Sequence, residues 1–263
     1  MNKAVPFIVA GAVIAGAAAF YFWYWTREPP LPAPAAVSST LPAPATPEPE
    51  AGQHFPAPQP PEPVAARELP ALDASDRTVL DDLAGLASAD TIARYVVPQQ
   101  IIRNIVVTVD NLPRKSFAWR LSPLKPVGGA FQTTGTEGNL VIAAGNASRY
   151  VPYVTVAKSI NAKKLVLAYG GLYPLFQKAY EDLGYPKGYF NDRLIAVIDH
   201  LLATPERAGP IALVTPRVQS EFADPELEAL SSGQKILLRM GPENAAAIKD
   251  KLREIRNQLT GAK

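Results

Sequence analysis

The sequence predicts a mainly α-helical domain with a small β element, an α+β fold dominated by helix, preceded by one transmembrane helix and a proline-rich linker. Three observations support this prediction: a long uncharged apolar stretch near the N-terminus, a proline-rich and alanine-rich segment after it, and helical spacing of apolar residues through most of the remainder. They divide the chain into an anchor at 1–26, a disordered linker at 27–70 and a helical domain at 71–263.

The anchor is predicted at residues 4–26, which carry no charge and would span roughly 35 Å as a helix. The stretch ends in aromatic residues, which are typical of the headgroup level of a membrane. A cleavable signal peptide is the alternative, but bulky aromatics directly follow the alanines at 17–19 where cleavage would occur. Lys3 precedes the stretch, whereas Arg27 and Glu28 cancel after it, so we expect a cytoplasmic N-terminus.

The linker at 27–70 consists mainly of proline, alanine and glutamate, and contains LPAPA at Leu31 and again at Leu41. Proline fixes φ and favours the extended polyproline II helix, so the segment could reach up to roughly 130 Å. We expect a stiff, disordered spacer, in preference to a recognition motif for a proline-binding module.

The first half of the domain is predicted to contain helices on either side of a short hairpin. One helix follows Ser75, and a second carries Ile102 and Val109 before residues 110–113 end it. Glycines then interrupt the helical repeat, so a β-hairpin is expected at 131–134 and 140–143.

Helical spacing resumes in the second half, at 150–157 and at 163–183, where Pro174 should kink or split the helix. Asn191 is expected to cap the next helix, which is followed by a strand at 211–214.

A further helix should begin at Ser231 or Ser232, and Pro242 should open the last one. The apolar stripe of the last helix should face the domain and its charged residues should face solvent: Ile248, Leu252, Ile255 and Leu259 inward, and Lys249, Asp250, Arg253, Glu254 and Arg256 outward.

Six separated segments, in order along the chain, resemble the domain of unknown function 3014 (DUF3014) family of bacterial membrane-anchored proteins. They are DNLPR at Asp110, SRYVPY at Ser148, GLYPLFQKAYEDLGYP at Gly171, FNDRLIAVIDHLL at Phe190, FADPELEALSSGQK at Phe222 and LLRMGPENA at Leu237. The resemblance covers roughly 76–259 and implies a bacterial source, hence an inner-membrane protein with a periplasmic C-terminal domain. It implies no reaction and no catalytic residues.

Several classes of site are excluded by residue usage. The chain has no cysteine, and His200 is the only histidine of the domain, so disulfides, thiolate sites and multi-histidine metal sites are not available. The GTEG sequence at Gly135 lacks both the lysine of a phosphate loop and the spacing of a dinucleotide fingerprint. We therefore predict no metal and no cofactor.

A cell-wall hydrolase remains an alternative to a binding protein. Asp192 and Asp199 lie two helical turns apart, close to the roughly 10 Å carboxylate separation of inverting glycosidases. His200 could also act as a base for a serine, such as Ser148, Ser159 or Ser231. The structural interpretation, an exposed carboxylate pair and a packing histidine, is preferred.

Polar residues within otherwise apolar sequence are the candidate ligand-binding or ion-pairing residues: Arg149, Tyr150, Tyr153, Tyr169, Tyr173, Asn191, Asp192, Arg193, Arg239 and Asn244. Buried charges are normally paired, so we expect Asp192 to pair with Arg239 or Arg149 and hold helices in register. A ligand pocket lined by the tyrosines is the alternative.

The partners predicted are the membrane, through residues 4–26, and an envelope protein or an anionic envelope polymer, but no nucleic acid. Eleven basic residues against two acidic ones between 94 and 178 favour the anionic partner if they share a face; otherwise they are spread over the surface. The sequence thus predicts a membrane-anchored periplasmic binding or scaffold protein, with the hydrolase or a spacer of the TonB or TolA type as alternatives.

Overall fold

The computed structural model describes residues 54–58, 68–136, 138–215 and 220–261. The anchor predicted at 4–26 and most of the predicted linker lie outside the described residues. Within the described ranges, no helix combines the length and the apolar character needed to cross a bilayer.

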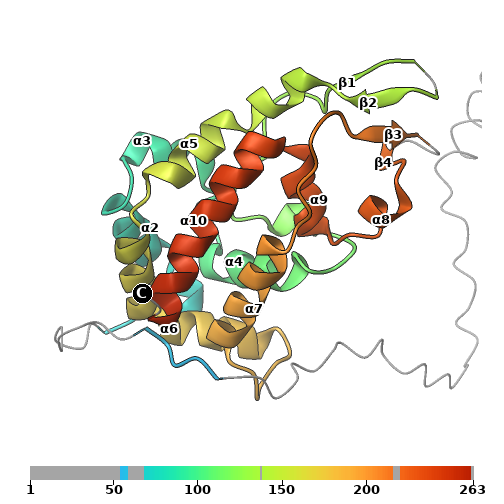
Figure 1. Cartoon of the computed structure of the whole chain (residues 1–263). Coiled ribbons are helices and arrows are strands. Elements are labelled where there is room, and N and C mark those ends of the chain that lie inside the picture. The colour runs from blue at the N-terminus through green and yellow to red at the C-terminus, as the bar shows by residue number, and fades with distance from the viewer. Residues whose placement is uncertain (1–53, 59–67, 137, 216–219, 262–263) are drawn as a thin grey trace, which may run out of the picture. The chain divides into compact units, whose positions relative to one another are not determined.

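The predicted helix-dominated fold with a small sheet is confirmed (Figure 1). The α-helices are α2 (Asp76–Ala84), α3 (Ala89–Tyr95), α4 (Ile101–Asn111), α5 (Val151–Ser159), α6 (Ala162–Asp182), α7 (Phe190–Leu202), α8 (Pro225–Glu228), α9 (Ser232–Arg239) and α10 (Pro242–Thr260). The strands are β1 (Thr133–Thr134), β2 (Leu140–Ile142), β3 (Ala212–Val214) and β4 (Glu221–Phe222). Three 3₁₀ turns complete the described elements: η1 (Leu72–Ala74), η2 (Trp119–Leu121) and η3 (Ala144–Arg149).

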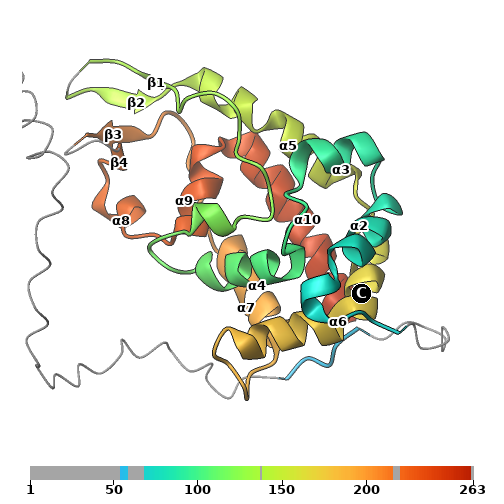
Figure 2. The ribbon, with the colours of Figure 1, turned by 180° about the vertical axis from the view of Figure 1, so that it is seen from behind.

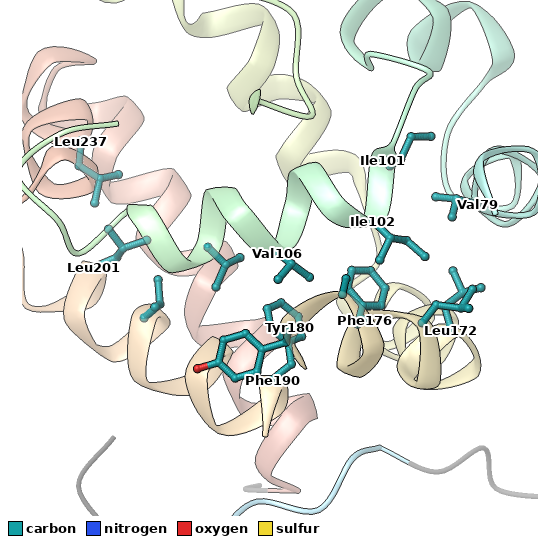
Figure 3. Close-up of a cluster of buried hydrophobic side chains, with 14 of the residues drawn as sticks. Val79, Ile101, Ile102, Val106, Leu172, Phe176, Tyr180, Phe190, Leu201 and Leu237 are labelled. Atoms are coloured by element: carbon teal, nitrogen blue, oxygen red, sulfur yellow. The ribbon is translucent and has the colours of Figure 1, made fainter. Parts of the chain in front are cut away.

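The main core lies between α4, α6, α7 and α10. Helix α10 packs along α5, α6 and α7, and α4 packs on α6 and α7, as the view from behind also shows (Figure 2). The buried apolar face of α4, including Ile102 and Val106, meets an aromatic cluster on α6 and α7 (Figure 3). In that cluster the Phe176 and Phe190 rings stack with centroids 5.6 Å apart. Fully burying such side chains stabilises a fold by roughly 1.5–3 kcal/mol each, so this contact defines the domain.

The four strands form one antiparallel sheet in the order β1-β2-β3-β4. Thr133 pairs with Ile142, and Leu213 is flanked by Leu140 and Phe222. The sheet covers its own small apolar cluster, to which α9 contributes Leu238. The predicted hairpin and the strand at 211–214 are therefore confirmed, whereas β4, α3 and α8 were not predicted.

The structure differs from the prediction at the start of α7 and inside α6. Tyr189, not Asn191, is the N-cap of α7, and Asn191 is helical and fully buried. At Pro174, where a kink or a split is expected, helix α6 is not split but continues past the proline, and the kink stays a prediction. Buried Leu172, Leu175 and Phe176 hold the helix on both sides of the proline, so packing outweighs the lost backbone hydrogen bond.

The charged face of α10 is also not uniformly solvated. Lys249 was expected to face solvent, but it is only 4% exposed. Its ammonium donates to the Thr204 carbonyl, 2.6 Å away, because the loop after α7 folds over this side of α10.

Candidate functional site

Residues 54–58, from the predicted linker, lie against the folded domain beside α6 and α7 (Figure 1, blue). The Phe55 amide donates to Asp192 Oδ1 at 2.7 Å, and His54 Nδ1 lies 2.9 Å from the other carboxylate oxygen. The Asn191 side-chain amide donates to the carbonyls of Phe55 and Pro56, at 3.1 and 3.3 Å. Asn191 and Asp192 together therefore hold the backbone of an extended segment on both its donor and its acceptor side.

The side chains of the segment also have defined places. Phe55 packs against an apolar cluster on α6, α7 and α10, whose buried members are Val166, Ile195, Ile198 and Leu259. The His54 and Tyr189 rings lie 4.1 Å apart between centroids. The Pro58 carbonyl passes so close to Gly170 that a β-carbon there would lie 2.4 Å from it. We call this set of contacts the α6–α7 groove.

Tyr169 fixes the orientation of the Asn191 side-chain amide. The Tyr169 hydroxyl donates to Asn191 Oδ1 at 3.3 Å, which turns the amide nitrogen toward residues 55 and 56. Burial, with the neighbouring Tyr173 and Asp192, raises the pKa of Tyr169 far above its ordinary value, so its hydroxyl remains a donor. Asp192 lies in the first turn of α7, where the helix dipole favours a carboxylate.

Tyr173 also lies beside this groove, with its ring centre 5.8 Å from that of Tyr169. The other predicted site residues are not brought to the groove, and the expected ion pair of Asp192 with Arg149 or Arg239 is wrong. Arg149 donates to the carbonyls of Gly128 and Gly129 and to Asn146, and its guanidinium lies 5.6 Å from the Tyr150 ring centre. Arg239 lies over Phe131 and Phe222 near the sheet. Polar groups and aromatic rings next to each guanidinium therefore hold Arg149 and Arg239 in place, and neither arginine pairs with Asp192.

The remaining polar candidates serve local packing. Arg193 pairs with Asp110 through an Nε–Oδ1 contact of 3.1 Å. The Tyr173 hydroxyl donates to Gln177, whose own amide oxygen accepts from the Phe190 backbone. Two more anchor loops or helix ends: the Tyr153 hydroxyl donates to the carbonyls of Lys125 and Pro126, and the Asn244 amide donates to those of Ala147 and Met240.

The residues of the hydrolase alternative are not assembled into a catalytic triad. Asp199 pairs with Arg256, with Nη2 and Oδ2 3.1 Å apart, and Asp192 holds residues 54–55. His200 Nε2 does contact Ser231 Oγ at 2.9 Å, but that oxygen also caps α9 in a capping box. Burial and the positive charge of Arg193 lower the pKa of His200. No acidic side chain among the described residues contacts this histidine, and no group of them could hold a metal ion.

His54 and Phe55 were missed because composition assigned them to a spacer. One signal could have found them: within residues 27–70 they are the only histidine and the only aromatic residue. Residues 55–58 also repeat, as FPAP, the apolar-Pro-Ala-Pro pattern that occurs as LPAP at 31–34 and 41–44.

Comparison with known families identifies the chain's family. A family model described as a protein of unknown function, DUF3014, matches residues 101–256. No curated protein and no solved structure matches the chain. The matched range contains Tyr169, Gly170, Asn191 and Asp192, the receptor side of the α6–α7 groove, whereas residues 54–58 precede it.

Proposed function

The chain belongs to the DUF3014 family, and we propose that it is a membrane-anchored binding or scaffold protein of the bacterial cell envelope, whose periplasmic domain binds extended proline-containing segments in the α6–α7 groove. The observation that carries the proposal is the seat of residues 54–58 on Asn191 and Asp192. Support for the membrane part comes from the uncharged stretch at 4–26 and from Lys3 before it.

The chemistry of the groove suits proline-rich ligands. Recognition of polyproline II segments relies on a preformed, extended backbone whose ordering costs little entropy. Proline has no amide hydrogen to donate. At Pro56 the groove contacts the carbonyl instead, which accepts a hydrogen bond from Asn191. The one amide hydrogen that the groove accepts comes from Phe55, which also supplies the apolar side chain. The motif read is therefore an apolar residue followed by Pro-x-Pro.

A peptide partner is favoured over an anionic polymer, because three of the eleven basic residues at 94–178 are already paired with carboxylates. Arg103 pairs with Asp73 and Asp182, and Lys178 also pairs with Asp182. Arg114 pairs with Asp110. Neighbouring carboxylates of the domain therefore partly neutralise the positive charge that an anionic polymer would bind.

The test uses the full chain in detergent with His54→Ser and Phe55→Ser, changes that release the chain's own segment. Fluorescein-labelled peptides are titrated and followed by anisotropy: GQHFPAPQP, from residues 52–60, and STLPAPAT, from residues 39–46. We expect both to bind, the first more tightly because it carries the histidine and the larger apolar side chain. A peptide with serine in place of the phenylalanine is the negative control.

Two adjacent glycines of α6 provide matched variants. Gly170→Ala places a methyl 2.4 Å from the Pro58 carbonyl, whereas at Gly171 the added carbon meets no described atom within 4 Å. Each change should stabilise the helix by about 0.5–1 kcal/mol. Only Gly170→Ala should weaken peptide binding, by about tenfold or more, which corresponds to about 1.4 kcal/mol. Equal affinities in the two variants, or no binding of GQHFPAPQP at all, would contradict the proposal.

A further inference from the structure

A separate cavity lies between the sheet end of the domain and the start of α10. Its volume is about 660 Å³, and its walls come from β2, the loop after α7, the end of α9 and the first turns of α10. Most of the lining is apolar, including Ile142, Pro210, Ile211 and Leu238. Sites for small molecules usually enclose roughly 300–1,000 Å³ of such surface, so the space is adequate for one.

The polar side chain that distinguishes this cavity is Lys249. The residue is 4% exposed, and its ammonium has one close acceptor, the Thr204 carbonyl at 2.6 Å. The nearest carboxylate, Glu206, is 3.7 Å away on a side chain that is 86% exposed. An ammonium carries three donors, and a buried charge is costly unless it is paired. Lys249 therefore has donor capacity left over in a largely apolar wall.

Two independent features add positive character to the same walls. Arg239 lines the cavity, and its Nε is the one buried side-chain nitrogen or oxygen of the described residues without a hydrogen-bond partner. The N-terminus of α10 also lines it, and the N-cap, Gly241, supplies no side-chain cap. The acidic side chain of its first turn, Glu243, is exposed, so the positive end of the helix dipole also faces this wall.

We propose that this cavity binds an anionic amphiphile, a molecule with one acidic head group on an apolar body. The head accepts hydrogen bonds from Lys249, and the body lies against the aliphatic walls. The acidic side chains of the lining, Glu206 and Glu243, are exposed, and Arg207 is paired with Asp224. The site uses none of the residues of the α6–α7 groove, so it does not depend on the proposed function.

The test is photo-crosslinking of the full chain in lipid nanodiscs with a diazirine derivative of dodecanoic acid. Mass spectrometry of the digested chain locates the crosslink, so that partitioning into lipid does not count as binding. We expect crosslinks in the loop after α7 and in the first turns of α10. Dodecanoate should compete with the probe about tenfold better than dodecanol, which lacks the charge.

Lys249→Met keeps the apolar stem and removes the charge, so it should reduce crosslinking about tenfold. Lys251→Met is the matched control: it lies on the same helix but does not line the cavity. If Lys249→Met does not fold, as judged by circular dichroism, Ala144→Trp decides instead, because it fills the cavity from an exposed position and should abolish the crosslinks. Crosslinks elsewhere in the chain, equal competition by dodecanol, or unchanged crosslinking in the variant that folds would overturn the proposal.

Discussion

Asn191 and Asp192 are neighbours in the first turn of α7 but have different roles. Asn191 is fully buried, and its amide accepts a hydrogen bond from Tyr169, which fixes its orientation. Asp192 is 28% exposed at the side chain and meets the amide hydrogen and the histidine of the ligand segment. A rigid donor beside a more exposed acceptor gives a groove that fixes the direction of a bound chain.

Asp110 is the carboxylate on which the stability of the domain should depend most. It is 2% exposed and accepts from Arg114 Nη2 at 2.6 Å and from Arg193 Nε at 3.1 Å. Asp110→Asn should lower the free energy of unfolding by about 1–3 kcal/mol, because it removes the buried counter-charge from Arg114 and Arg193, whose own side chains are 44% and 25% exposed. Chemical denaturation measures this loss. The exposed pair of Asp224 with Arg207 is the control, and Asp224→Asn should cost about 1 kcal/mol or less.

His200 should make stability depend on pH. Its pKa is lowered from 6.5 by burial and by Arg193, so just below pH 6.5 the unfolded chain binds more protons than the folded one. Stability is therefore full above about pH 6.5, falls as the pH drops below it, and stops falling below the folded pKa. Melting temperatures from pH 7.5 to 5 should show this decline in a His54→Ser chain, where His200 is the only histidine. His200→Gln should flatten it, and a variant with the same slope would disprove the assignment.

At the level of elements, the sequence predicts what long periodic patterns or cap residues determine. Ser231 starts α9 as predicted, and its box with Gln234 is complete. Helix α8 and strand β4 are too short to show a period of their own, so they could not be predicted. At Pro174 the split that the local signal allows does not occur, because packing that no local pattern reveals holds both sides of the proline in one helix.

The apolar stripe of α10 is the clearest element to test. Leu252 packs against both the main core and the cluster that holds Phe55. Leu252→Ala should lower the free energy of unfolding by about 2–5 kcal/mol, as other large-to-small core changes do. Arg253→Ala, at an exposed position next to it, should cost about 0.5 kcal/mol or less. Equal losses in the two variants would mean that α10 is not held by its apolar face.

At the scale of the whole molecule, the helical domain and its small sheet were predictable, but the groove was not. One partner in each of the groove's contacts comes from residues 54–58, which lie more than a hundred positions before Asn191 in a segment that composition assigns to a spacer. Composition reports whether a segment can form its own core, and this one cannot. It does not report whether five of its residues fit another core's surface.

The membrane topology is the prediction for the intact chain. A reporter enzyme that is active only outside the cytoplasm, fused after Lys263, should be active, because Lys3 precedes the uncharged stretch at 4–26. Activity of a cytoplasm-specific reporter at the same position would contradict this. Mass spectrometry of the mature N-terminus tests the signal-peptide alternative, since cleavage after 17–19 would remove the anchor.

The seat of residues 54–58 also determines how the domain would respond to a pull. Tension arriving from the N-terminal side meets the hydrogen bonds of Asn191 and Asp192 before it reaches the first helix of the core. These few bonds would break first and spare the core. Residues 54–58 would then join the extended linker and add up to roughly 15 Å at 3.1 Å per residue. Release under force would be reversible, because a released segment that remains tethered to the domain can bind to the groove again.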